Sequence, residues 1–510
     1  MIKKALLVIA FTTPLYTSAQ TESSTGNIDA AVTKLKVLIA KTMLETGVPG
    51  LAVAIVYKGE TKLIHGYGYR KLGDKAEVDQ DTVFEIASLS KPIASTIVAS
   101  LVGTGEVRWD DRIETLDPPF KLSDSMATER LTIRDLFAHR SGLPTSAGDV
   151  LEDLGYSRPE ILRKLRFIPL AGPFRQTYHY SNFGLTEGAM ASVRATGKTW
   201  EEVAQERLYS KIGMSSTSSR YSDYENNPNK AALHYFQDGV YKNWFDREGD
   251  AESPAGGVSS NVRDLAKWMQ LQLNGGAFGG QQIVDQAALE ETHKAQICRS
   301  PNPVAPGKCA DGYYGLGWNV ASDAQGRLMV SHSGGFDLGS ATAVYLLPSE
   351  QAGCVALTNG TPTGIPESLC LSFLDDLRYG KVQNDYFAFF KPIFADILRK
   401  TQDSSPDYSK LSPPRNSSPC GSLSAYKGTY VSALYGKLRI DVEQDHLVLR
   451  LPPRDAYYEL TYWDGDTFTF YFASENTGVA RRGLTFLHGG KQVLVENLAI
   501  VNDGVFTKVN

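Results

Sequence analysis

The hydrophobic periodicity of this chain changes near residue 420, and the change constrains the fold more than any other feature. Beyond it, Lys437–Glu443 alternates strictly between polar and apolar residues, and two more period-two stripes follow, formed by Leu447, Leu449 and Leu451 and by Phe468, Phe470 and Phe472. Such alternation is typical of strands with one buried face. We expect about eight short strands between Gly428 and Val509. Residues 421–510 are therefore predicted to form a small antiparallel β-barrel, with a sandwich as the alternative.

The longer part of the chain predicts an α+β domain over residues 28–400. Apolar residues recur at helical spacing over residues 28–46, and helices with long loops are expected between residues 81 and 274. Strand-like runs lie on both sides of that region, at 51–57, 62–69, 328–331, 341–347 and 354–358. This order predicts an antiparallel sheet built from both ends of the domain, flanked by helices and interrupted by an all-helical insert. The Ser- and Pro-rich residues 401–420 are predicted to link this domain to the barrel.

Charge and hydropathy limit the possible partners. The formal net charge of −5 gives no basic footprint, which argues against a nucleic-acid partner. Residues 1–19 have the three parts of a signal peptide: Lys3 and Lys4, a short apolar run, and small residues before a cleavage point after Ala19. No later stretch is apolar for long enough to span a bilayer. We therefore expect an exported protein, periplasmic or secreted, while its oligomeric state stays open.

The five cysteines are compatible with an oxidising compartment. Cys298 and Cys309 flank a Pro- and Gly-containing segment and are the best candidates for a disulfide, and the odd total leaves at least one thiol unpaired. Cys354 lies in an apolar run, where we expect a buried and inert thiol. The spacings do not resemble a zinc site, and we expect neither a metal nor a cofactor.

Ser88 and Lys91 form an S-x-x-K pattern at the start of a predicted helix. A Ser hydroxyl is a weak nucleophile until a neighbouring base takes its proton, and a Lys one turn further along the helix can reach it. Lys91 must be neutral to act as that base, which requires a closed site or nearby cations. Taken alone, the segment is better explained by Ser88 as a helix N-cap and Lys91 as a solvated side chain.

Two further motifs follow in the chain. Tyr180-x-Asn182 can direct a proton-transferring phenol and an orienting amide into one cleft. His332, Ser333, Gly334 and Gly335 come after a strand-like run, where glycines allow a ligand to approach the backbone closely. Each motif in isolation is better explained as ordinary structure, a packed Tyr in a turn and a His at the end of a strand.

In this order the three motifs resemble the signature of the serine β-lactamase and penicillin-binding-protein superfamily, S-x-x-K, then Y-x-N, then K-T-G or H-x-G. The match is closest to the class C-like branch, which also contains D-Ala-D-Ala carboxypeptidases, D-aminopeptidases and esterases. The flanking sequence is similar to that branch in four segments, Phe84–Ala87, Leu136–Pro144, Leu208–Met214 and Pro254–Val258. The C-terminal segment resembles the lipocalin-like domains of some peptidases in the branch.

The resemblance implies roles for these residues. Ser88 would be the nucleophile, and Lys91 and Tyr180 would share the base and acid roles. Asn182 would orient the substrate, with His332, Ser333 and Gly334 as further substrate-binding residues. The backbone N–H groups of Ser88 and Gly335 would form the oxyanion hole. His332 stands where class C β-lactamases have Lys, and near neutral pH an ordinary His is only partly charged, so a fixed cation for a β-lactam carboxylate is not assured.

These inferences favour an exported serine hydrolase that forms an acyl-enzyme on Ser88. Its substrate would be a small molecule or peptide with a carbonyl to acylate Ser88, and D-amino-acid peptides or peptidoglycan stems are the leading class. A carboxylesterase and a weak class C-like β-lactamase are alternatives within enzymes. A penicillin-binding sensor without turnover is an alternative of another class. The barrel could bind wall material, cover the mouth of the active site or mediate oligomerisation.

Overall fold

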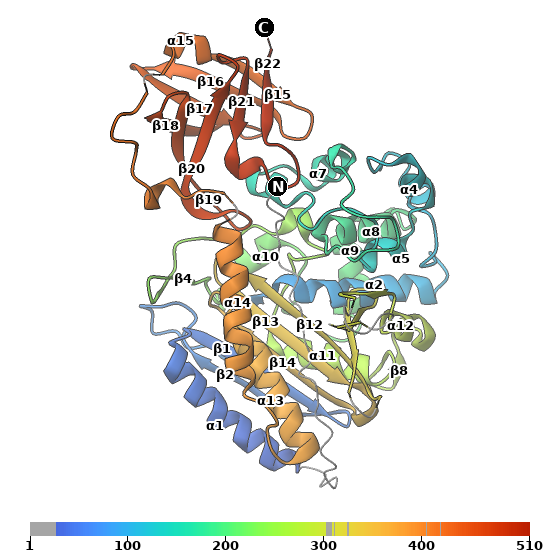
Figure 1. Ribbon diagram of the computed structural model, residues 1–510. Helices are drawn as coiled ribbons and strands as arrows, with labels where there is room; N and C mark the ends of the chain where they lie inside the picture. Colours follow the sequence, from blue (N-terminus) through green and yellow to red (C-terminus); the bar gives the residue numbers. More distant parts are fainter. Residues whose placement is uncertain are drawn as a thin grey trace.

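The computed structural model describes residues 27–301, 309–310, 312–323, 326–403, 405–418 and 420–509. The predicted signal peptide, residues 1–19, lies outside them. Two bodies are evident in Figure 1, a layered domain with a central sheet and a separate barrel at the C-terminal end. The predicted α+β fold with an antiparallel sheet, a helical insert and a C-terminal barrel is confirmed. Of the described helices, none combines the length and apolarity needed to cross a membrane.

The central sheet has eight strands, all paired antiparallel. In spatial order they are β2 (Glu60–Gly68), β1 (Gly50–Tyr57), β14 (Ala352–Thr358), β13 (Ser340–Leu347), β12 (Leu328–Phe336), β11 (Asn319–Ser322), β10 (Tyr313–Tyr314) and β9 (Ile297–Cys298). Strands from both ends of the domain therefore meet at the β1–β14 pair, as the sequence predicts. Three two-stranded sheets accompany it: β3 (Phe84–Glu85) with β6 (Ser259–Ser260), β4 (Tyr235–Gln237) with β5 (Val240–Lys242), and β7 (Ala277–Phe278) with β8 (Gln281–Gln282).

Helices cover both faces of this sheet, so its central strands are apolar on both sides. In β1, Leu51, Val53 and Ile55 pack toward α1 (Ile28–Thr46) and α13 (Ile365–Tyr379). The intervening Ala52, Ala54 and Val56 pack on the other face, which α11 (Val262–Leu273) covers. Beyond α11 lie α2 (Ser90–Gly103) and α12 (Gln286–Thr292), which contact each other.

The insert is a group of short helices beyond α2 (Figure 1). They are α3 (Ile113–Leu116), α4 (Ser125–Arg130), α5 (Ile133–Phe137), α6 (Asp149–Leu154), α7 (Arg158–Lys164), α8 (Asn182–Arg194), α9 (Trp200–Ala204) and α10 (Tyr221–Glu225). Long loops separate them, so the core of the insert is assembled from many short apolar segments rather than from a regular bundle.

The C-terminal segment forms a closed barrel in which each strand pairs antiparallel with the next and β22 closes on β15. Its strands are β15 (Gly428–Ser432), β16 (Gly436–Glu443), β17 (His446–Leu451), β18 (Ala456–Asp464), β19 (Thr467–Ser474), β20 (Gly478–Leu487), β21 (Gln492–Val495) and β22 (Val505–Val509). The predicted leucine and phenylalanine stripes are buried in it. The last helix of the first domain, α14 (Tyr386–Gln402), runs from α13 toward the barrel (Figure 1).

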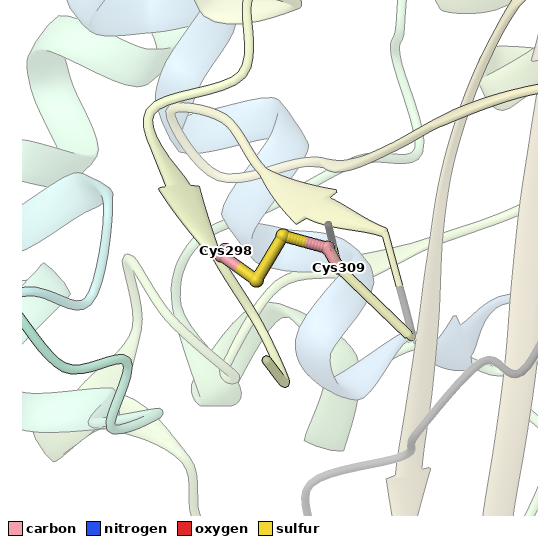
Figure 2. The surroundings of a disulfide bond; sticks show 2 residues. All are labelled: Cys298 and Cys309. Atoms are coloured by element: carbon pink, nitrogen blue, oxygen red, sulfur yellow. A yellow bond between two sulfur atoms is a disulfide. The ribbon is translucent and has the colours of Figure 1, made fainter. Parts of the chain in front are cut away.

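Two disulfides are present. Cys298 is bonded to Cys309, the pairing favoured by the sequence, with their Cα atoms 5.7 Å apart (Figure 2). The expectation that Cys354 is an inert free thiol is wrong, because it is bonded to Cys370. Cys354 is on the face of β14 that packs against α13, and Cys370 projects from α13 with its Cα atom 5.4 Å from that of Cys354. Cys420 carries the remaining thiol.

Asp135 of α5 fixes the loop that leads to the second motif. Its carboxylate is fully buried and accepts hydrogen bonds from Arg140 at 2.7 Å and from Arg175 at 2.8 Å. It also accepts from the Thr132 backbone as half of a capping box. The backbone bond from His179 N to His139 O, at 2.9 Å, then positions the segment that carries Tyr180.

We expect Asp135→Ala to lower the free energy of unfolding by about 3–5 kcal/mol, because it leaves two guanidinium groups without their shared partner in a partly buried site. Urea denaturation followed by circular dichroism measures this. Asp110 is a matched control because its side chain is 69% exposed in its pair with Arg134, and Asp110→Ala should cost less than about 1 kcal/mol. Equal losses in the two variants would contradict the role of Asp135.

Candidate active site

Ser88 lies in a 3₁₀ turn (Ala87–Leu89, η1) that leads directly into α2. Ala87 has a φ of +49°, a left-handed conformation that L-residues with a Cβ rarely adopt. Such conformations persist only where the surroundings hold them. Here the Ile86 N–H donates to Val258 O at 3.0 Å, and Thr342 Oγ1 of β13 donates to Ile86 O at 2.8 Å. Hydrogen bonds to both backbone groups of Ile86 thus hold the turn that presents Ser88.

The side chains of the first two motifs converge on the Ser88 hydroxyl. Lys91 Nζ lies 2.9 Å from Ser88 Oγ, and the Tyr180 hydroxyl donates to the same oxygen at 2.8 Å. Lys91 Nζ also donates to Asn182 Oδ1 at 2.8 Å and to the Ala255 carbonyl at 2.9 Å. The structure thus brings together four residues that the sequence places in one cleft, and it adds the carbonyl of Ala255.

Lys91 is fully buried, whereas Ser88 is partly exposed. The pKa of Lys91 is lowered to about 7, mainly by burial and in part by the buried Arg247 guanidinium, while Glu252 and Asp149 oppose this shift. A substantial fraction of the amine is therefore neutral near pH 7, and a neutral amine 2.9 Å from a hydroxyl can accept its proton. The closed environment that the base role requires is present.

Tyr180 stays a neutral phenol throughout the ordinary pH range, because burial raises its pKa well above the usual value. Lys91 Nζ also lies over its ring, 4.5 Å from the centroid. A neutral phenol can donate a proton, so Tyr180 and Lys91 together offer an acid and a base at one oxygen. Asn182, at the first position of α8, is supported by Asp149, whose Oδ1 lies 3.5 Å from Asn182 Nδ2.

His332 is neutral, not partly charged as the sequence suggests. Its pKa is lowered to about 3, mainly by burial and in part by the nearby Lys91. Its Nδ1 lies 2.7 Å from Ser333 O, and its Nε2 lies 2.9 Å from the hydroxyl of Tyr314. A carbonyl oxygen only accepts, so Nδ1 carries the proton and Nε2 accepts from Tyr314. The imidazole is thus a polar wall of the site rather than a cation.

Successive residues of the third motif lie on opposite faces of β12. Gly334 faces the site, and a Cβ there would lie 2.8 Å from the Ser88 backbone nitrogen, so only glycine allows this approach. Ser333 pairs with Ala343 and shares its face, which packs toward α13 and Glu367. Its side chain therefore does not reach the cleft, because successive side chains of a strand point to opposite faces. Gly335 follows Gly334 along the same strand, pairing with Ala341 of β13.

The structure adds residues that the motifs do not contain. His139, with a φ of +54°, packs at a tilt between the rings of Tyr180 and Tyr314 and accepts a hydrogen bond from Ser181 N at 3.1 Å. The segment Leu136–Pro144 is one of the flanking similarities in the sequence, and this contact shows what its His does. The charges of Glu252, Asp149 and Arg247 shift the pKa of Lys91. No motif in the sequence indicates these three residues. Among the described residues, no cluster of His, Cys, Asp or Glu could hold a metal ion.

The fold defines a class of protein, because it is the serine hydrolase fold shared by β-lactamases and penicillin-binding proteins. The beta-lactamase family profile matches residues 35–368, and a domain of unknown function (DUF3471) matches residues 412–493. Since the first match spans well over half of the chain, the protein belongs to the beta-lactamase family.

Relatives and solved structures agree with this assignment. An unguisins hydrolase of Aspergillus violaceofuscus is 26% identical over 83% of this chain and 80% of its own length. The protein flp of Staphylococcus aureus strain COL is 23% identical over 68% of each chain. The octameric penicillin-binding protein homologue from Pyrococcus abyssi has a TM-score of 0.57 at 20% identity, covering 91% of this chain and 98% of that one. At that identity the likeness demonstrates the fold alone.

We expect the imidazole of His332 to remain neutral between about pH 5 and 8, where exposed histidines titrate. The ring-proton shift of His332, assigned by its disappearance in His332→Gln, should stay constant in NMR spectra over this range. Exposed histidines in the same spectra provide the titrating reference. A midpoint near 6.5 for the assigned signal would contradict the neutral wall described above.

Proposed function

We propose that this protein hydrolyses its substrate through an acyl-enzyme on Ser88. One observation carries the proposal: Ser88 Oγ is in contact with both a buried amine whose pKa is about 7 and a neutral phenol. A nucleophile, a base and an acid at one oxygen are what covalent acyl transfer requires. The beta-lactamase family profile and the relative named a hydrolase support the same reaction class.

The proton movements follow from the contacts. As Ser88 Oγ bonds to the substrate carbonyl carbon, its proton moves to the neutral Nζ of Lys91. The backbone N–H groups of Ser88 and Gly335 are proposed to stabilise the oxyanion, a contribution that typically amounts to roughly 100- to 1000-fold per donor. The Tyr180 hydroxyl then gives its proton to the departing nitrogen or oxygen and regains one from Lys91. Water attacks the acyl-enzyme with the same groups in reverse roles.

For the substrate, we propose a D-amino-acid peptide or a related amide, with an ester or a β-lactam as alternatives. Within the described part of the chain, β11 pairs with β12 only as far as Ser331, and His332–Phe336 pair on one side alone, with β13. An extended peptide could add along that edge through its main chain. The neutral His332 supplies no cation for a β-lactam carboxylate or for the C-terminal carboxylate of a D-Ala-D-Ala peptide, so it does not distinguish these two substrates. Export to the periplasm or medium remains part of this proposal.

A substrate panel tests the reaction. A D-Ala-D-Ala peptide, a p-nitrophenyl ester and a chromogenic cephalosporin are compared for kcat/KM, and intact-protein mass spectrometry monitors acylation of Ser88. We expect turnover of the peptide, and a loss of at least about 1000-fold in Ser88→Ala, because no other residue can replace the nucleophile. A fully active, folded Ser88→Ala protein would contradict the mechanism. A stable Ser88 adduct without turnover would instead identify a penicillin-binding sensor.

The base role of Lys91 predicts the direction of the pH dependence. Only the neutral amine accepts the Ser88 proton, so kcat/KM should rise with pH through a midpoint of about 7 and decline at lower pH. Because kcat/KM reports the free enzyme, substrates with different leaving groups should give the same midpoint. A profile that is flat across this range would show that Lys91 is not the base.

A further inference from the structure

A cavity of about 580 Å³ lies in the first domain, apart from the cleft of Ser88. Its walls come from the end of α11, from α12, from the start of β12 and from the turn between β13 and β14. The described residues that line it include none of those that converge on Ser88. Small-molecule sites typically have volumes of about 300–1,000 Å³, so this cavity has room for a ligand of its own.

His293 lines this cavity and carries a ring nitrogen without a hydrogen-bond partner. The residue is 9% exposed, and its Nε2 is a buried atom with no partner among the described residues. The ring packs edge to face against Trp318, with centroids 5.1 Å apart. Burial lowers the pKa of His293 to about 4, so the imidazole is neutral near pH 7. In its neutral form Nε2 either donates or accepts one hydrogen bond, depending on the tautomer.

Gln272 of α11 brings a second unpaired atom to the same cavity. Its Nε2 donates to Thr96 Oγ1 of α2 at 2.7 Å, and the Thr96 hydroxyl donates its single hydrogen to Pro92 O at 2.8 Å. Thr96 can therefore only accept from Gln272, which fixes the orientation of the amide. Gln272 is 4% exposed, and its Oε1 has no partner in the described part of the chain. A buried acceptor without a donor is costly, so a ligand that donates to Oε1 gains free energy.

The two charged residues that line the cavity are exposed and paired. Lys294 is 64% exposed, and its Nζ lies 2.9 Å from Glu291 Oε2. Glu290 accepts from Gln286 Nε2 at 2.7 Å. One acid and one base therefore face the cavity, and their charges cancel. Because neither is buried, neither provides a desolvated partner for an ion. These walls favour a neutral ligand over an anion or a cation.

The other lining residues are amides and apolar side chains. The amides are exposed and surround the mouth, whereas leucines and a proline form the wall; they are Asn274, Gln286 and Gln351, and Leu289, Leu328 and Pro348. An aliphatic hydroxyl both donates and accepts, so it can bond Gln272 Oε1 and also His293 Nε2 in either tautomer. A peptide amide divides these two capacities between separate atoms. A ring with several hydroxyls and an apolar C–H face matches both the amides and the wall.

We propose that this cavity is a binding site for a neutral saccharide, recognised through Gln272 Oε1 and His293 Nε2. The site is separate from the acyl-transfer cleft, and its recognition does not depend on Ser88 chemistry. Through the bond between Gln272 and Thr96, the saccharide would be held on α2, the helix that begins directly after the turn of Ser88. The protein would thus bind a sugar and present its nucleophile from one rigid element.

Calorimetric titration of the full-length protein tests the class of ligand. The neutral probes are glucose, galactose, mannose and N-acetylglucosamine. Glucosamine and glucuronate carry opposite charges on a similar ring, and N-acetyl-alanyl-alanine amide is a neutral peptide. We expect at least one neutral sugar to bind with a Kd tighter than about 5 mM. The charged sugars and the peptide should bind that sugar's site at least about fivefold more weakly, because they lack a matching partner there.

Two substitutions of His293 separate recognition from packing. His293→Gln keeps a polar group near the position of Nε2, so the Kd should stay within about threefold of the original. His293→Phe keeps the ring against Trp318 but removes its nitrogens, so binding should weaken about tenfold. His65→Phe is the matched control, because His65 is exposed on β2 and packs edge to face against Tyr67, with centroids 4.6 Å apart. It should leave the Kd unchanged.

Thermal denaturation supplies a readout that a packing role alone would not give. Removing an unpaired buried nitrogen relieves a cost in the free protein, so His293→Phe should melt no lower than the original. The saccharide should raise the Tm of the original protein and of His293→Gln, as a ligand that binds only the folded state does. It should raise the Tm of His293→Phe much less at the same concentration.

Three outcomes overturn the saccharide site. They are a Kd weaker than about 5 mM for every neutral sugar, equal or tighter binding of the peptide or of a charged sugar, and binding that His293→Phe does not weaken. If His293→Phe fails to fold, as judged by circular dichroism, Gln286→Ala decides instead. Gln286 is exposed at the mouth, so its loss should weaken binding about threefold and leave the fold intact. An unchanged Kd in Gln286→Ala would then overturn the site.

Discussion

The burial of the Lys91 amine beneath Ser88 is the constraint on which the rest of the site depends. An amine in water is protonated at neutral pH and cannot activate a hydroxyl. Here the amine is enclosed by α2, α8 and the Ala255 segment, and burial brings its pKa to about 7. A buried cation also requires partners, and Asn182 and the Ala255 carbonyl provide them without adding a negative charge in direct contact. The arrangement keeps the amine poised between its two protonation states.

The same constraint explains why His332 is neutral. A protonated imidazole next to the Lys91 amine would be a second buried cation, and repulsion between the two lowers the pKa of His332, whereas a neutral imidazole that accepts from Tyr314 adds polarity without charge. Where class C β-lactamases carry Lys in this motif, this chain carries a group that burial holds uncharged. The net positive charge that a substrate carboxylate would need is thus absent from this wall. The selectivity of the cleft must come from other surfaces.

The sequence predicted the parts of the structure that depend on local pattern and order. The period-two stripes predicted the barrel, and the order of strands around a helical region predicted a sheet shared by both ends of the domain. The order of the motifs, through their resemblance to a known family, predicted a common cleft for Ser88, Lys91, Tyr180 and Asn182. The Cys354–Cys370 bond was missed because an apolar run gives no indication of which helix will cover it. Ser333 was assigned to the cleft because the motif alone does not say which face of the strand each residue occupies. The local sequence around Arg247 and Glu475 does not predict where these residues lie, because their positions depend on how the barrel packs against the first domain.

That meeting bonds the barrel to the domain that carries Ser88. Glu475 and Asn476 are bonded to the end of β12 and to α6, and Tyr156 of the insert donates to Tyr435 O of the barrel at 2.7 Å. Because the turn between β19 and β20 is fixed by Arg482 and its own hydroxyls, its carboxylate is held beside a guanidinium that already serves two carboxylates. The barrel therefore contributes a fixed carboxyl group next to the buried Arg247 guanidinium, where α6 and the end of β12 meet.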